Sequence, residues 1–148
     1  MNIPVHIRKK LFHKDFSIYI SNGKLEESYL ILGSTHLYEN KMRIWFENDK
    51  EAIKLSFYHE YGHCIDACDG ELFSRTNNNW EEAFKRERQL FFSYLEAKNK
   101  KLEAIWQNAI SNKTEYFAEV FSEYIKNKDV LQKHCPESFR LMDKFLNS

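Results

Sequence analysis

The sequence predicts an α+β fold, in which a small N-terminal β-sheet packs on a mostly helical remainder covering two thirds of the chain. Apolar residues alternate or form short runs before residue 48, as in strands, and recur at helical spacing after it. The 148 residues include only four glycines and two prolines, so few residues interrupt the helices, and an aromatic content of 16% predicts a core of bulky rings. At this length we expect a single domain over residues 1–148 that buries its core without disulfides.

The N-terminal third contains the predicted strands. Residues 16–21 lead into Asn22-Gly23, a dipeptide that is the strongest short-range signal for a β-hairpin. Residues 28–33 are a second apolar run, which ends at a glycine, and residues 42–47 alternate around Trp45. The pattern predicts three or four strands, with a hairpin turn after residue 21.

Helices are predicted through the rest of the chain, each with an apolar face and several with a polar cap or a proline in the first turn. Residues 73–79 are predicted to form a loop whose last residue, Asn79, caps the helix that follows. The predicted helices cover about residues 49–67, a segment from about 80, residues 102–109 and 114–125, and a last segment from 136.

Charge and composition exclude several classes of protein. Lys+Arg and Asp+Glu are balanced at 22 each, so the chain lacks the basic surface of a nucleic-acid binder or a peripheral membrane protein. It has no signal-peptide pattern, no apolar stretch of transmembrane length, and an odd number of cysteines, three. We therefore expect a cytoplasmic monomer without nucleic-acid or membrane partners. The alternatives for location are export by a leaderless route or a leader that precedes this sequence.

One pentapeptide, residues 59–63, carries recognisable chemistry: it reads His-Glu-Tyr-Gly-His, an HExxH motif in a predicted helix. On a helix His59 and His63 project from one face a turn apart, so both imidazoles can bind one Zn²⁺. Glu60 projects beside them, where it can accept a proton from water activated by the metal. Chance produces the pattern in about 2–3% of such chains, but a helical context with a ligand downstream favours zinc.

A third ligand is expected from the helix at residues 114–125. Glu115 and Glu119 are again four residues apart, so one carboxylate can bind the metal while the other hydrogen-bonds a ligand histidine. Spacing alone does not choose between them. Asn112 and Glu115 also fit a capping box, in which Glu115 would accept from a backbone N–H instead.

Together, residues 59–63 and the segment Glu-Tyr-Phe-Ala-Glu-Val-Phe at 115–121 resemble the protease domain of anthrax lethal factor. They are similar also to the bacterial Pro-Pro endopeptidases, and all of these are gluzincin metallopeptidases. The resemblance covers about residues 53–146. It implies a zincin-like fold with the small sheet packed on the helix of the HExxH motif.

The resemblance also implies roles for individual residues. His59, His63 and Glu115 would ligate one zinc ion per chain, Glu60 would be the general base, and Glu119 would support a ligand histidine. The implied function is a zinc-dependent endopeptidase that hydrolyses peptide bonds of protein or peptide substrates.

One position departs from the family. Seven residues before the glutamate ligand, where the family has an oxyanion-stabilising tyrosine, this sequence has Asn108. Losing an oxyanion donor typically costs about 10²–10³ in rate. Asn108 and Trp106 are therefore candidate oxyanion or substrate contacts. The alternative function is a zinc-stabilised peptide-binding module with weak or lost catalysis.

Substrate-binding segments are expected just before the motif helix. Residues 42–47 form either an edge strand that pairs with an extended peptide or an ordinary strand of the sheet. Residues 33–36 are a candidate loop at the cleft, although His36 is more simply a surface histidine. Gly62 is expected to allow close packing of the motif helix against a neighbour.

Overall fold

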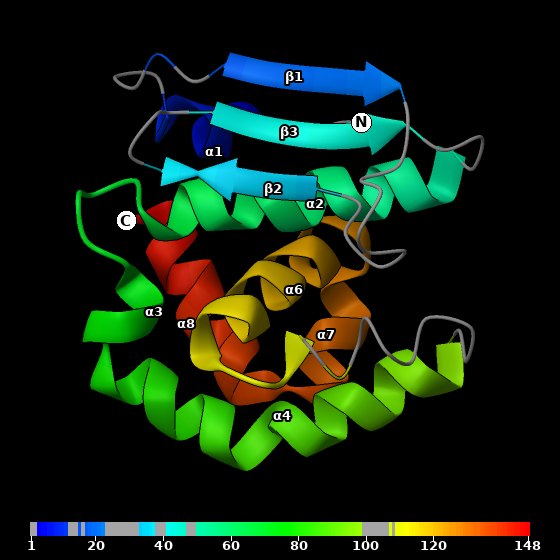
Figure 1. Cartoon of the computed structure of the whole chain (residues 1–148). Helices are drawn as coiled ribbons and strands as arrows, with labels where there is room; N and C mark the ends of the chain where they lie inside the picture. The colour runs from blue at the N-terminus through cyan, green and yellow to red at the C-terminus, as the bar shows by residue number, and fades with distance from the viewer. Residues whose placement is uncertain are drawn as a thin grey trace.

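The protein is described by a computed structural model that covers residues 3–11, 15, 17–22, 33–37, 41–46, 50–98, 107 and 109–148. Figure 1 shows a small sheet lying on helix α2 (Lys50–Asp66), with the remaining C-terminal helices on the other side of α2. The predicted α+β class, with strands first and helices after, is confirmed.

The sheet contains β1 (Ser17–Asn22), β2 (Gly33–His36) and β3 (Lys41–Phe46) in the spatial order β1-β3-β2. β3 pairs parallel with β1 and antiparallel with β2. Gly23 and most of the second predicted strand, residues 28–33, lie outside the described residues, so the hairpin after residue 21 stays a prediction. The parallel pairing of β1 with β3 requires a crossover connection between these two strands.

β3 is the central strand, so the edge-strand alternative for residues 42–47 is wrong and the ordinary-strand alternative is correct. Its side chains alternate: Met42 and Ile44 are buried, whereas Lys41 and Arg43 are exposed. This alternation identifies the face of the sheet that packs on α2. The expected loop at residues 33–36 is instead β2, the strand beside β3 on the side away from β1.

The other helices are α1 (Val5–Lys9), α3 (Phe73–Thr76), α4 (Asn78–Lys98), α6 (Lys113–Lys126), α7 (Lys128–His134) and α8 (Pro136–Asn147). Those expected from about residue 80, over 114–125 and from 136 are confirmed as α4, α6 and α8.

Residues 73–79 are not a simple loop, because they contain α3. The cap of α4 is Asn77 rather than Asn79, since the Asn77 Oδ1 accepts from the backbone N–H of Trp80 at 3.0 Å. Most of the helix expected over 102–109 lies outside the described residues.

Helix α6 is the centre of the helical part. Every residue from Tyr116 to Tyr124 is buried, and aromatic rings of other helices surround it. Trp80 of α4, for example, packs with its ring centre 5.1 Å from that of Phe117, edge to face. Burial of each such ring contributes about 1.5–3 kcal/mol, so α6 is held firmly in place. The predicted aromatic core is confirmed.

Glu123, near the end of α6, is a charged residue inside this core. Its side chain is 1% exposed and forms ion pairs with Lys98 at 3.1 Å and Lys126 at 2.7 Å. It also accepts a hydrogen bond from the Tyr94 hydroxyl at 2.9 Å. Burial alone would raise the pKa of the Glu123 carboxyl, but the lysines outweigh it and lower the pKa below its ordinary value of 4.5.

Glu123→Gln is expected to lower the free energy of unfolding at pH 7 by about 2 kcal/mol, because hydrogen bonds to a charged group are replaced by neutral ones. Since the folded pKa is lowered, the contribution of the carboxylate is full above about pH 4.5 and is lost as pH falls toward the folded pKa. Urea unfolding between pH 3 and pH 7 should therefore show wild type and variant converging in acid. A stability difference that does not change with pH would contradict this assignment.

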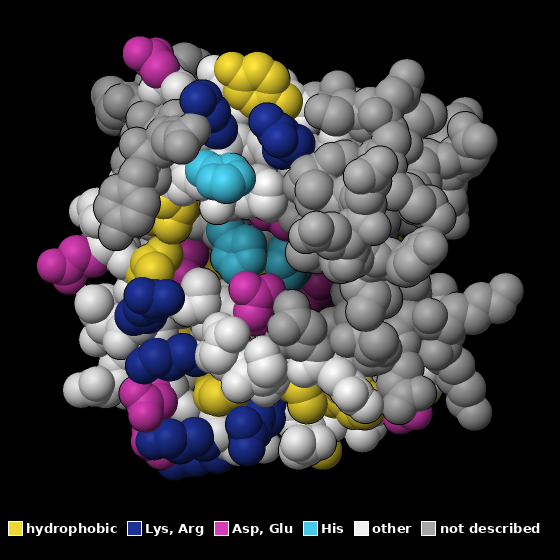
Figure 2. Space-filling model, in the orientation of Figure 1, with side chains coloured by type: hydrophobic (Ala, Val, Ile, Leu, Met, Phe, Trp, Pro, Cys, Tyr) yellow, Lys and Arg dark blue, Asp and Glu magenta, His cyan; other side chains and the backbone are white. Residues whose placement is uncertain are grey.

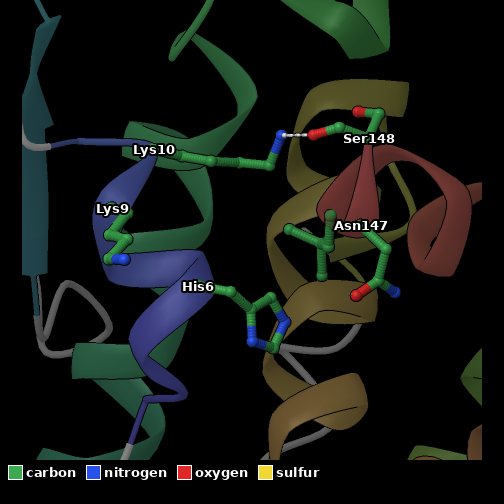
Figure 3. Close-up of a pocket in the computed structure, with 6 residues that line it drawn as sticks. His6, Lys9, Lys10, Asn147 and Ser148 are labelled. Atoms are coloured by element: carbon green, nitrogen blue, oxygen red, sulfur yellow. Dashed lines mark hydrogen bonds between the residues drawn. The ribbon is translucent and has the colours of Figure 1, made fainter.

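None of the helices in the described ranges combines the length and the hydropathy needed to cross a membrane. A separate pocket of about 330 Å³ lies between α1 and the end of α8. Figure 3 shows Lys10, the C-cap of α1, reaching Ser148, where its Nζ donates to the backbone oxygen at 3.3 Å. The lining of this pocket includes none of the predicted site residues.

Candidate metal centre

Helices α2 and α6 together bring the predicted ligands to one place. His59 and His63 lie one turn apart on α2, and Glu115 lies in the first turn of α6. Their donor atoms all lie within 4.8 Å of one another. Figure 2 shows histidine and acidic side chains gathered in a hollow of the surface between β2 and the start of α6.

The distances within this cluster fit a metal ion. The Nε2 atoms of His59 and His63 are 3.1 Å apart, and Glu115 oxygens lie 3.3 Å from His59 Nε2 and 3.6 Å from His63 Nε2. Tetrahedral ligands about 2.0–2.1 Å from zinc are about 3.3–3.4 Å from one another. The separations in the cluster are close to this spacing, with Oε2 of Glu115 nearer to His59 and Oε1 nearer to His63. Two imidazoles and one carboxylate are also a donor set typical of a catalytic zinc site.

The cluster is open on one side. The side chains of His59, His63 and Glu115 remain 18%, 14% and 25% exposed. A catalytic metal site keeps a coordination position for water or substrate, whereas a structural site is closed by four protein ligands. The partial exposure of all three side chains is therefore consistent with a site that admits a substrate.

Glu119 forms a hydrogen bond with His59 at the ring nitrogen that does not face the cluster. Its Oε1 lies 2.8 Å from His59 Nδ1 and accepts a hydrogen bond from it. That bond fixes the proton on Nδ1, so Nε2 can present its lone pair to the centre of the cluster. Glu115 and Glu119 thus face His59 from two sides: Glu115 at Nε2 and Glu119 at Nδ1.

The close approach of the two carboxylates to His59 shifts the pKa values of the cluster. Burial lowers the pKa of His59, but the hydrogen bonds with Glu115 and Glu119 outweigh it and raise that pKa well above 6.5. Burial raises the pKa of Glu115, and hydrogen bonds with His59 and His63 lower it far below 4.5. Metal ligands must be deprotonated, so a cation bound by His59 and Glu115 would compete with the proton that these groups share.

Asn112 sets the start of α6. Its Oδ1 accepts from the backbone N–H groups of Thr114 and Glu115, both at 3.0 Å, so it is the N-cap that the sequence predicts. The Glu115 side chain nevertheless faces His59 and His63. Asn112 therefore caps the helix and Glu115 contributes to the cluster, and the capping box does not compete with the metal site.

Gly62 explains how closely α2 and α6 approach. A Cβ at this position would lie 2.8 Å from the Cα and 3.1 Å from the carbonyl oxygen of Ala118. Both atoms belong to the backbone of α6, so they cannot move aside as a flexible side chain would. The prediction that Gly62 allows close packing is confirmed.

Gly62→Ala is expected to force α2 and α6 apart, weakening zinc binding and lowering the free energy of unfolding by about 1–3 kcal/mol, the cost of overpacking. Zinc titration and urea unfolding measure the two effects. The matched control is Gly70→Ala: Gly70 has φ 99°, and a Cβ added there would meet no neighbouring atom within 4 Å. This control should lose about 1–2 kcal/mol through backbone strain and keep its zinc affinity. Unchanged zinc affinity in Gly62→Ala would contradict the assigned role.

Glu60 lies beside the cluster and is 6% exposed. Its carboxylate oxygen Oε2 accepts a hydrogen bond from the Thr35 hydroxyl of β2 at 2.6 Å. The sequence predicts residues 33–36 at the cleft, but no motif identifies Thr35 within them, because its contact depends on where β2 crosses α2.

The remaining predicted residues are not part of this cluster. His36 is exposed on β2, with its Nε2 3.3 Å from the Ser34 hydroxyl, so it is a surface histidine. Asn108 and Trp106 lie outside the described residues. Their expected contact with an oxyanion or a substrate therefore stays a prediction.

Comparison with known proteins connects the chain to one family. A family model described as anthrax toxin lethal factor, N- and C-terminal domain, matches residues 40–145, more than two thirds of the chain. No match was found among curated proteins or among solved structures. The matched range contains β3, α2 and α6, and with them every residue of the candidate metal centre.

Proposed function

The chain belongs to the anthrax toxin lethal factor family, and from that premise we propose that it is a zinc-dependent endopeptidase acting on protein or peptide substrates. The observation that carries the proposal is the convergence of His59, His63 and Glu115, with the buried Glu60 following His59 on α2 and acting electrostatically on it. Three zinc-type donors and a nearby base are the parts that peptide hydrolysis at a metal requires.

The protein side of the mechanism follows from the contacts of these residues. His59, His63 and Glu115 would hold the ion, and Glu119 would keep His59 in the tautomer that presents Nε2. Zinc, when bound, supplies a Lewis acid that polarises the scissile carbonyl and lowers the pKa of water. Glu60 would accept the proton of the attacking water and donate it to the leaving amine.

The substrate would lie along β2. This strand pairs with β3 on one side, and no other described strand pairs with its second edge. An extended peptide can add to such an edge through main-chain hydrogen bonds. Because Thr35 of β2 contacts Glu60, a peptide on this edge would pass close to the proposed base.

Cleavage profiling on a diverse peptide library tests the proposal. The zinc-loaded protein is expected to cleave a subset of peptides, to lose this activity when a chelator removes the metal, and to regain it when zinc is restored. A zinc-loaded chain that binds peptides from the library without cleaving any would contradict the proposal and support the binding-module alternative.

A further inference from the structure

Thr35 occupies a defined position between the sheet and the motif helix. In the β2–β3 ladder it stands opposite Met42, whose buried side chain lies on the face that packs on α2. Residues opposite each other in a ladder share a face, so the Thr35 side chain also points toward α2. Its neighbours Ser34 and His36 point to the other face and contact each other there.

The Thr35 hydroxyl contacts Glu60 at two atoms. It donates to the carboxylate Oε2 at 2.6 Å and lies 3.1 Å from the backbone oxygen of the same residue. The shorter contact is a charge-assisted hydrogen bond, which is about twice as strong as a neutral one. The hydroxyl has one proton, so the backbone oxygen of Glu60 is an alternative acceptor for it, and the branched Cβ of threonine restricts the rotation of the side chain.

We propose that Thr35 is a positioning residue for the general base: its hydroxyl holds the Glu60 carboxylate in one orientation beside the metal ligands. The inference rests on the proposed function and adds to it. A glutamate has three rotatable bonds, and fixing them before the reaction removes an entropic cost from the catalytic step. The strand that is proposed to bind the substrate would thereby also align the base.

Thr35→Val, compared with Thr35→Ser, tests the role. Valine keeps the branched shape and removes the hydroxyl, whereas serine keeps the hydroxyl. With a peptide that the wild type cleaves, Thr35→Val is expected to lower kcat by about 10–100-fold, with KM within about twofold and zinc content unchanged. Thr35→Ser should stay within about threefold of wild type in kcat. Thr76→Val in α3 is the matched control, since the Thr76 hydroxyl donates to the Leu72 backbone oxygen at 3.1 Å, and this variant should behave as wild type.

Two results would overturn the inference: a kcat for Thr35→Val within about twofold of wild type, or an equal loss in Thr35→Val and Thr35→Ser. The first would show that the hydrogen bond does not align the base. The second would show that a change of shape, rather than the hydroxyl, causes the loss.

A measurement without turnover separates this inference from the proposed function. Urea unfolding of the metal-free chain is measured for Thr35→Val, Glu60→Ala and the double variant. The two single changes in unfolding free energy should not add up to that of the double variant, and the difference should correspond to more than about fivefold in the folding equilibrium constant. Additive effects would overturn the contact on which the inference rests. If the cycle shows coupling but the wild type cleaves no peptide, the proposed function fails while the Thr35–Glu60 contact stands.

Discussion

Glu60→Gln is expected to lower kcat for peptide hydrolysis by about 10²–10⁴-fold, the usual contribution of general acid–base catalysis, while zinc stays bound. Glutamine has nearly the shape of glutamate and can still accept the Thr35 hydrogen bond, but it cannot accept a proton from water. The metal ligands His59, His63 and Glu115 are unchanged in this variant. Steady-state cleavage assays and elemental analysis of the same sample measure both quantities.

Glu87→Gln is the matched control for this variant, since Glu87 is another buried glutamate, 5% exposed. It accepts from the backbone N–H groups of Glu137 and Ser138 at the start of α8, with no contact to the cluster among its hydrogen bonds. It should lose some stability and keep its kcat. Unchanged turnover in Glu60→Gln would exclude Glu60 as the base.

His63→Ala is expected to abolish zinc binding at micromolar metal, because two protein donors remain where the site requires three. The loss should far exceed the about 10–100-fold expected for Glu119→Gln, which removes only the hydrogen bond behind His59. Competition with a chromophoric chelator measures both affinities on one scale.

His36→Ala serves as the control for this series, since His36 is an exposed histidine of β2 and not one of the converging donors. It should retain wild-type zinc affinity. If His63→Ala bound zinc as tightly as wild type, the ion would have to be held elsewhere and the site assignment would be wrong.

The helical part of the fold could be predicted from the sequence because its signals are local. The Asn112 cap, the proline at the start of α8 and the apolar periodicity of α4 each act within a few residues of where they appear. The short helix α7 was not predicted as a separate element, because only Leu131 of its seven residues is buried and seven residues are too few to show a period.

Strand pairing could not be predicted in the same way. Asn22-Gly23 indicates a turn, but turn propensity does not say which strand the chain will pair with. Among the described strands, β1 pairs with β3, through a parallel register of Ser17 with Lys41. This arrangement places Met42 and Ile44 against α2, and such burial is a property of the whole fold.

In the candidate site too, the residues with local sequence signals could be predicted and those that depend on long-range contacts could not. Residues four apart on a helix have a known geometry, so the pair His59 and His63 could be identified from spacing alone. The choice of Glu115 required the family resemblance. Thr35 had no sequence signal, because its contact with Glu60 depends on the β2–β3 register and on the way the sheet lies over α2.

The most direct test of the zinc site is a crystal structure of the zinc-loaded chain, with anomalous scattering measured on both sides of the zinc absorption edge. We expect one peak about 2.0–2.2 Å from His59 Nε2, His63 Nε2 and a carboxylate oxygen of Glu115. A peak at another place on the surface, or no peak in crystals equilibrated with zinc, would contradict the account.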